Sequence, residues 1–188
     1  MLRRWARHGN DHRTTLSPPL WLLGLGAALT SAGCASHPAA GVIPSEPAVS
    51  GAAVVVEVID GDTIDVAIDG RRERVRLLGI DTPEVARPES GRAAECGADS
   101  ATAFTASLLP DGTDVLLTRD VVGRDHYGRL LAYVHRIDDG VFVNYELARQ
   151  GHADTLHLEP NGIHRVVLAD AVAQARSERA GMWGVCRG

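Results

Sequence analysis

Three closely spaced stretches of β-strand pattern constrain the fold of this 188-residue chain more than any other feature. Residues 53–59 are apolar and mostly β-branched, residues 63–68 alternate between apolar and polar side chains, and residues 72–80 alternate again. Asp69-Gly70 separates the second stretch from the third, and this dipeptide strongly favours a hairpin turn. The pattern therefore predicts a three-stranded meander.

The segments after the meander predict a mixture of helices and strands. In chain order they are a helix over 97–109, strands over 114–119 and 130–137, a short strand over 141–143, a helix over 145–150 with Asn144 as its N-cap, and a helix over about 162–180. This order is typical of an α+β fold. Five short antiparallel strands around one helix suit a five-stranded OB-fold-type Greek-key β-barrel with three α-helices.

The charge distribution limits how the chain could bind a polyanion. All 19 basic residues are arginine, and the net charge is −5. Residues 35–188 hold 15 of these arginines against 23 acids, which leaves a balance of −8. A protein that binds nucleic acid by bulk electrostatics would be basic, so any such role here must depend on a local site with a metal ion.

The first 34 residues read as a secretory signal peptide. Residues 1–13 are basic, residues 20–30 are apolar, and Ser31-Ala-Gly leads into Cys34. This junction resembles a bacterial lipobox, which predicts lipidation at Cys34, although Ser31 stands where leucine is preferred. Ordinary cleavage and secretion is the alternative. Either route predicts an extracytoplasmic protein, lipid-anchored at the cell membrane or released.

Residues 35–52 are rich in Ala, Pro, Ser and Gly without periodicity, and we expect a flexible linker. The folded domain is then expected over residues 53–188. Two cysteines remain there, Cys96 and Cys186, in a compartment that permits disulfides. They form either one disulfide bridge or two separate buried thiols.

Acidic and basic residues gather around the ends of the predicted meander. Asp62 begins one strand, and Asp81 follows the end of its hairpin partner, so both carboxylates reach the same end of the sheet. With the carbonyl of Thr82 they form a hard oxygen site suited to Ca²⁺. Either acidic segment alone would be read as a polar turn or a loop start. Their combination with Arg129 favours a functional site.

The stretch from about Val55 to Trp183 resembles the staphylococcal nuclease, or thermonuclease, family. The resemblance rests on separated motifs that occur in order over about 130 residues. They are Asp60-Gly-Asp-Thr63, Arg76-Leu-Leu-Gly-Ile-Asp-Thr-Pro-Glu84, Asp125-His-Tyr-Gly-Arg129, Leu131-Ala-Tyr133, Val143-Asn144 and a last helix that ends at Trp183.

The resemblance implies a role for each matching residue. Asp62 and Asp81 would bind Ca²⁺ through their carboxylates, and Thr82 through its backbone oxygen. Glu84 would act as general base near the attacking water, and Arg76 and Arg129 would hold the substrate phosphate. Tyr127 is expected to pack against and position the substrate.

The implied reaction is metal-assisted hydrolysis of phosphodiester bonds in single-stranded or unwound DNA and RNA. It would be endonucleolytic, would leave 3′-phosphate ends, and would be performed by a monomer. The physical logic agrees, because a cation and two guanidinium groups can stabilise the charge that builds on the phosphoryl oxygens.

Two alternatives remain open. A non-catalytic OB-type module that binds nucleic acid or a partner protein would need no water-activating carboxylate, and an envelope lipoprotein could retain only vestigial hydrolysis.

The loop 85–96 carries Arg87 and Arg92 but also Glu89 and Glu95. We therefore expect weaker substrate binding and steeper salt dependence than in a basic family member.

Overall fold

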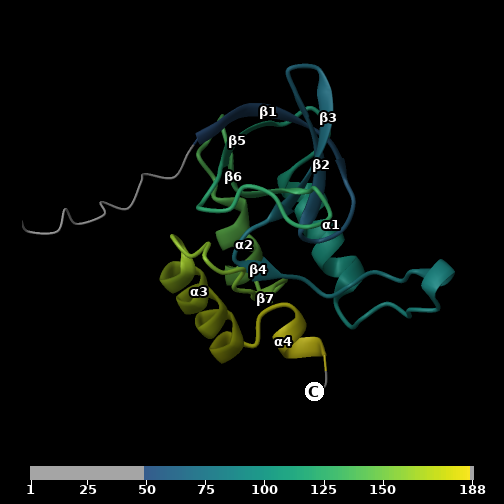
Figure 1. Cartoon of the computed structure of the whole chain (residues 1–188). Helices are drawn as coiled ribbons and strands as arrows, with labels where there is room; N and C mark the ends of the chain where they lie inside the picture. The colour runs from purple at the N-terminus through teal and green to yellow at the C-terminus, as the bar shows by residue number, and fades with distance from the viewer. Residues whose placement is uncertain (1–48, 187–188) are drawn as a thin grey trace, which may run out of the picture. The chain divides into compact units, whose positions relative to one another are not determined.

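Five strands of the computed structural model, which describes residues 49–186, close into a barrel (Figure 1). Their order around the barrel is β1-β2-β3-β6-β5, and β5 pairs back onto β1. The prediction of purely antiparallel strands is wrong at one place, because β3 and β6 run parallel. The barrel strands are β1 (Val49–Val58), β2 (Thr63–Ile68), β3 (Arg71–Leu77), β5 (Asp114–Thr118) and β6 (Leu130–Arg136).

The β2–β3 hairpin forms where the Asp69-Gly70 turn was expected. Asp69 and Gly70 have φ values of 50° and 75°, which lie in the left-handed region that tight hairpin turns require. Ile64 and Val66 of β2 and Val75 and Leu77 of β3 are fully buried in the barrel. The ladder pairs Thr63 with Arg76, so the turn before β2 lies beside the last residues of β3.

The first strand begins at Val49, four residues before the expected start of the domain. The last residues assigned to the linker therefore pair with β5. The signal peptide, the lipidation site Cys34 and the rest of the linker lie outside the described residues. In the part of the chain that the structure describes, no helix combines the length and apolar character needed to cross a membrane.

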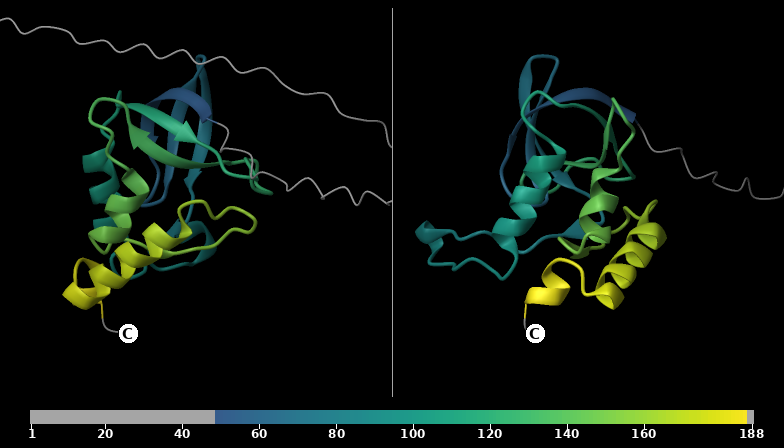
Figure 2. Two further views of the ribbon diagram at one scale, coloured as in Figure 1. Left: turned by 90° about the vertical axis from the view of Figure 1, so that its left-hand side faces the viewer. Right: turned by 180° about the vertical axis from the view of Figure 1, so that it is seen from behind.

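α3 and α4 lie at the opposite end of the ribbon from the β2–β3 hairpin (Figure 2). α1 runs from the long loop after β4 to β5, and α2 packs against both β6 and α3. β4 and β7 form a separate two-stranded antiparallel sheet. The bounds are β4 (Ile80–Asp81), α1 (Ala98–Leu108), α2 (Val143–Arg149), β7 (Asp154–Thr155), α3 (Arg165–Glu178) and α4 (Met182–Val185), with a 3-10 turn over Pro88–Ser90.

Two local predictions near α2 are wrong. Residues 141–143 form no strand, since only an isolated bridge joins Phe142 to His135 and α2 already begins at Val143. Asn144 is not the N-cap but a buried residue inside α2. Its Nδ2 donates to the Leu78 carbonyl at 2.8 Å, and its Oδ1 accepts from the Val134 amide at 2.9 Å. The side chain thus ties α2 to two segments of the barrel instead of capping the helix.

Gly79 lets α3 approach the barrel closely. It has a φ of 79°, and a Cβ at this position would lie 2.5 Å from Cδ1 of Leu168. Leu168 is buried and belongs to the core shared by the barrel, α2 and α3. The absence of a side chain at Gly79 is therefore compensated by a leucine from α3, which fixes the helix beside the β3–β4 connection.

Candidate functional site: an acidic cluster beside an arginine-lined cleft

The turn between β1 and β2 presents Asp62 beside the end of β3. The amides of Ile59 and Asp60 both donate to the Thr63 carbonyl, and the Leu77 amide donates to the Asp62 carbonyl at 2.8 Å. Oδ1 of Asp62 also accepts from the Thr63 hydroxyl at 3.1 Å. The turn is therefore fixed to both neighbouring strands, and the Asp62 carboxylate is held in a buried position.

Thr82, the residue after β4, contacts the same carboxylate. Its amide and its hydroxyl donate to Oδ2 of Asp62 at 3.0 Å and 3.2 Å. Gly61 makes this approach possible, because a Cβ there would lie 2.6 Å from Oγ1 of Thr82. The hydroxyl of Thr105 in α1 donates to the Gly61 carbonyl at 2.6 Å and holds the turn from the other side. Asp62 and Thr82, two of the three residues predicted as metal ligands, are therefore in direct contact.

Arg76 joins the two predicted metal ligands. Its Nη2 lies 3.1 Å from Oδ2 of Asp62 and 2.8 Å from Oδ1 of Asp81. Its Nη1 donates to the carbonyls of Leu77 and Ile80. The side chain of Arg76 is only 6 % exposed, whereas that of Asp81 is 54 % exposed. Arg76, whose direction the strand pattern left open, therefore lies between the two carboxylates.

The electrostatics of this cluster favour an added cation. Burial raises the pKa of Asp62 to about 6, although Arg76 and the Thr82 amide oppose the increase. Burial also raises the pKa of Asp81, again against the effect of Arg76. At both residues the effect of burial on the pKa exceeds the opposing effect of Arg76, although Asp81 is much the more exposed of the two. A divalent ion would add positive charge beside the two carboxylates and would favour their ionised forms.

The donor set fits a hard cation. Asp62, Asp81 and the carbonyl of Thr82 offer only oxygen atoms, which Ca²⁺ prefers. Within residues 49–186 no group of three or more His, Cys, Asp or Glu side chains is arranged to hold a metal. A cation bound here would therefore have two carboxylates and a carbonyl from the protein, and water would complete its coordination.

Glu84 lies in a cleft of about 610 Å³ next to this cluster. The cleft also exposes Tyr127 and Arg129, so it brings together three residues that the sequence assigned to base and substrate-binding roles. The acidic cluster borders the cleft at Thr63, which lines it and pairs with Arg76 in the β2–β3 ladder. Asp62, Arg76 and Asp81 thus form the acidic cluster, and Glu84 and Arg129 line the cleft beside it.

Two arginines from the loop after β4 hold the Glu84 carboxylate. Nη2 of Arg87 lies 3.0 Å from Oε2 of Glu84 and 3.9 Å from Oδ2 of Asp60, and Arg92 lies 3.6 Å from Glu84. The sequence identified these arginines as cations of the loop but not as partners of Glu84. Glu84 and Arg87 are three residues apart, a spacing that predicts an ion pair on a helix. In an irregular loop the same spacing does not predict whether two side chains meet.

The loop from Glu84 to Cys96 is closed at its base. The Glu95 amide donates to the Glu84 carbonyl at 2.9 Å, and the Glu84 amide donates to Oε2 of Glu95 at 3.0 Å. Directly after this closure, Cys96 forms a disulfide with Cys186, with their Cα atoms 5.7 Å apart. The bridge connects the start of α1 to the residue that follows α4.

Asp125 orients Arg129 toward the cleft. Oδ2 of Asp125 accepts from Nε of Arg129 at 2.7 Å, while Oδ1 accepts from the amides of Tyr127 and Arg129. Burial alone would raise the pKa of Asp125, but these bonds from Arg129 lower it below the usual value. The Arg129 guanidinium lies 5.6 Å from the centre of the exposed Tyr127 ring. Asp125 is the first residue of the Asp125-His-Tyr-Gly-Arg129 motif, but the sequence did not predict that it orients Arg129.

These features define a barrel-fold protein with an arginine-lined cleft next to an acidic cluster of oxygen atoms that suit a cation. Residues 74–185 match the family model described as staphylococcal nuclease homologue, and the chain belongs to this family. Asp62 precedes the matched residues, but the match includes Arg76, Asp81, Glu84 and Arg129.

Curated relatives agree with the family assignment. The chain is 38% identical over 130 residues to the thermonuclease of Staphylococcus intermedius, covering 69% of this chain and 74% of the relative. It is 35% identical over 129 residues to the thermonuclease of Staphylococcus hyicus, covering 69% and 73%. It is also 34% identical over 126 residues to endonuclease YncB of Bacillus subtilis, covering 66% of this chain and 58% of that protein.

Proposed function

We propose that this chain is a calcium-dependent nuclease that hydrolyses phosphodiester bonds in DNA and RNA outside the cytoplasm. One observation carries the proposal: Glu84 and Arg129 share a cleft bordered by the acidic cluster that Arg76 holds together. The names of the relatives, thermonuclease and endonuclease, support the same reaction class. We further propose endonucleolytic action on single-stranded or unwound strands, leaving 3′-phosphate ends.

Asp62, Asp81 and the Thr82 carbonyl would hold the calcium ion. When bound, the ion supplies positive charge beside the phosphate that reacts. Arg129, oriented by Asp125, donates to the phosphoryl oxygens and stabilises the charge that develops on them. Arg76 does the same if substrate draws one of its nitrogens away from the carboxylates. The planar guanidinium fork suits this task, since it donates two parallel hydrogen bonds.

Glu84 accepts a proton from the attacking water. The water oxygen forms a bond to phosphorus, and the bond between phosphorus and the 5′ oxygen breaks. The departing 5′ oxygen takes a proton from solvent, which leaves a 5′-hydroxyl on one fragment and a 3′-phosphate on the other. Glu84 must first exchange its contact with Arg87 for the water, and an entering phosphate that attracts Arg87 promotes this exchange.

The proposed location outside the cytoplasm rests on the signal pattern and on cysteine chemistry. A disulfide between Cys96 and Cys186 persists in an oxidising compartment. Lipidation of Cys34 would attach the protein to the membrane. Mass spectrometry of the N-terminal peptide from the native host tests this part separately, because a diacylglyceryl group on Cys34 and an unmodified cleaved terminus differ in mass.

The reaction is tested with the purified full-length chain on single-stranded DNA and RNA. Cleavage is measured with Ca²⁺ and with chelator, and mass spectrometry identifies the ends. Glu84→Gln and Arg129→Ala are the site variants, and Arg165→Ala, an exposed arginine of α3, is the matched control. We expect Ca²⁺-dependent cleavage, a loss of about two to three powers of ten in kcat in each site variant, and an unchanged control.

The same experiment distinguishes the non-catalytic alternative. A protein that retards the oligonucleotide in a gel without cutting it, with or without Ca²⁺, would be a binding module, and the nuclease proposal would be withdrawn. Cleavage that survives both substitutions would place the chemistry at other residues.

A further inference from the structure

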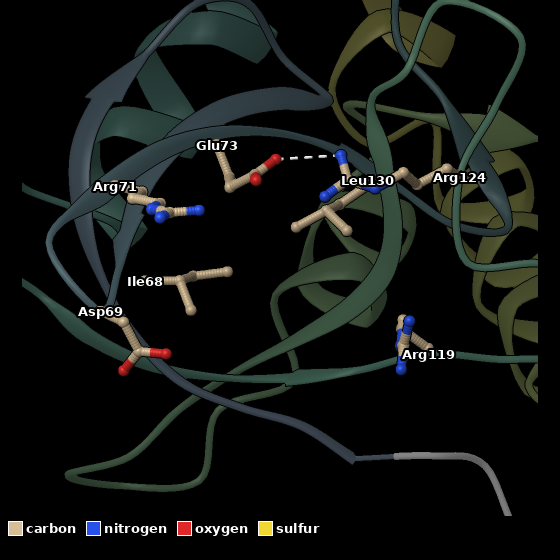
Figure 3. Close-up of a pocket in the computed structure, with 7 residues that line it drawn as sticks. All are labelled: Ile68, Asp69, Arg71, Glu73, Arg119, Arg124 and Leu130. Atoms are coloured by element: carbon tan, nitrogen blue, oxygen red, sulfur yellow. Dashed lines mark hydrogen bonds and ion pairs between the residues drawn. The ribbon is translucent and has the colours of Figure 1, made fainter.

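A second cavity, of about 510 Å³, lies where the β2–β3 hairpin meets the segment that leads into β6 (Figure 3). None of its lining residues lines the cleft of Glu84 and Arg129. We call it the hairpin pocket, and its walls include Arg71 and Glu73 of β3, Arg119 and Arg124 of the connecting segment, and the apolar Ile68 and Leu130.

The pocket holds more positive charge than its contacts neutralise. Arg124 is engaged, because its Nη1 donates to Oε2 of Glu73 at 2.9 Å and to the Gly128 carbonyl at 2.7 Å (Figure 3). Arg71 and Arg119 form no ion pair and no side-chain hydrogen bond with any residue in the range 49–186. Asp69, the other acid of the lining, forms no ion pair within that range either. Two guanidinium groups therefore face the cavity without a partner among these residues.

Arg119 also carries an unsatisfied buried donor. Its Nε is buried and has no hydrogen-bond partner within the described part of the chain. Gly123 lies against this side chain, since a Cβ at that position would be 3.0 Å from Cδ and 3.1 Å from Nη1 of Arg119. The Arg119 guanidinium therefore has no acceptor among the described residues for this donor, and an anion bound beside the side chain would compensate part of its charge.

We propose that the hairpin pocket binds a phosphate-bearing anion through Arg71 and Arg119. Guanidinium groups match the oxygen spacing of phosphate and donate to it in pairs. The volume lies within the range of small-ligand sites, and Ile68 and Leu130 offer apolar surface for the rest of a small molecule. The bound phosphate would come from one of two sources. One is free phosphate or a mononucleotide, and the other is a phosphodiester group of a nucleic-acid strand.

The pocket is distinct from the cleft in position. Arg71 precedes Arg76 by five residues along β3, which corresponds to about 17 Å along an extended strand. The two side chains also have opposite parity along the strand, so they point to opposite faces. An anion in the hairpin pocket would therefore not occupy the place of a phosphate that reacts beside Glu84.

The test observes Arg119 directly in the full-length chain with ¹⁵N-labelled arginine. The Nε resonance of Arg119 is assigned by its loss in Arg119→Ala. With chelator present, the protein is titrated with inorganic phosphate and, separately, with a dinucleoside monophosphate, which carries one diester and no terminal phosphate. We expect a saturable shift of the Arg119 resonance, with Kd about tenfold weaker in Arg71→Gln and unchanged in Arg165→Ala.

The two probes identify the source. A shift with inorganic phosphate supports a site for free phosphate or mononucleotides, and a shift with the dinucleoside monophosphate alone supports a site for a strand. No shift with either probe overturns the proposal, as does a shift whose Kd is the same in Arg71→Gln as in the unmodified chain. Because the readout is binding at Arg119 and not cleavage, its failure is distinguishable from failure of the proposed nuclease function.

Discussion

The carboxylate of Glu84 lies 3.0 Å from Nη2 of Arg87, a residue of the loop that follows it. This pair occupies the proposed general base in the absence of substrate. The same guanidinium lies 3.9 Å from Asp60, so it spans the cleft between two acids. In the proposed reaction, an entering phosphate would draw Arg87 away from Glu84, which would link substrate binding to availability of the base.

Arg87→Ala is expected to weaken substrate binding more than chemistry. The cleft loses one of its arginines, so KM should rise about tenfold, while kcat should change less than about threefold because Glu84 must give up its contact with Arg87 before it acts in any case. Steady-state kinetics on a fluorescent oligonucleotide measures both constants, with Arg165→Ala as the control for loss of one charge. A fall in kcat by two powers of ten with constant KM would instead assign Arg87 to the reaction itself.

Asp125→Asn is expected to reduce kcat about tenfold through loss of orientation at Arg129. Asparagine can still accept from the amides of Tyr127 and Arg129, but its Nδ2 cannot accept from Nε of Arg129. The effect should vanish when Arg129 is already alanine. Equal losses from Asp125→Asn in both backgrounds, measured in a double-mutant cycle, would show that Asp125 acts independently of Arg129.

Gly61→Ala is expected to impair the acidic cluster without touching its charges. The added Cβ would lie 2.6 Å from Oγ1 of Thr82 and would displace Thr82 from the Asp62 carboxylate. We expect the rise in melting temperature caused by Ca²⁺ to shrink and cleavage to fall at least about tenfold. Gly162→Ala is the matched control, since no other atom lies within 4 Å of a Cβ there. Equal Ca²⁺ responses in both variants would contradict the role assigned to Gly61.

The sequence predicted the barrel because alternation and a hairpin dipeptide act locally. Ile64 and Val66 are buried on one side of β2, and Asp69-Gly70 turns as its φ values require. The parallel pairing of β3 with β6 was not predictable in this way, because strands so far apart in sequence meet only after the intervening segments have folded. The prediction that Asn144 caps α2 failed for a related reason. Its two tertiary hydrogen bonds, to Val134 and Leu78, outweigh the local preference of asparagine for the N-cap position.

Site residues could be identified from the sequence where they lie in a short motif. Asp62, Arg76 and Asp81 meet because the hairpin register brings both ends of the motif to one edge of the barrel. The pairing of Glu84 with Arg87 and Arg92 depends on how an irregular loop closes, and no periodicity encodes that. The unpaired position of Arg119 is likewise a property of the packed structure.

Acidification is expected to destabilise the fold through partly buried histidines. Burial lowers the pKa of His135, and nearby His164 adds to this effect. Burial also lowers the pKa values of His152 and His164, although Asp120 opposes the shift at His164. A histidine whose pKa is lower in the folded state than in the unfolded state favours unfolding once the unfolded chain binds protons. The stability it gives is present above pH 6.5 and is lost as the pH falls below that value.

Urea unfolding in chelator at several values between pH 7.5 and pH 5 checks this expectation. Protonation of Asp62, whose pKa is raised to about 6, changes the free energy of unfolding in the opposite direction. The unmodified chain is therefore compared with a histidine variant that keeps Asp62, so that the Asp62 contribution is the same in both. His135→Gln keeps a planar polar group beside Phe142, on which His135 stacks at 4.4 Å. Its unfolding free energy should fall less steeply with acidification than that of the unmodified chain. Parallel pH profiles would show that His135 is not one of the groups responsible.

Removal of the disulfide is expected to lower stability and to loosen the loop that carries Arg87. The bridge joins residues 90 positions apart, and loop entropy gives it a contribution of about 4 kcal/mol to the free energy of unfolding. The double variant Cys96→Ser, Cys186→Ser should therefore unfold at lower urea and be insensitive to reductant, whereas reductant should shift the unmodified chain to the same midpoint. Neither cysteine belongs to the hydrophobic core of the described residues, so the fold of the barrel should persist at neutral pH. If the reduced and oxidised chains unfold at the same urea concentration, the bridge does not stabilise the folded chain by constraining the unfolded one, which would contradict the prediction.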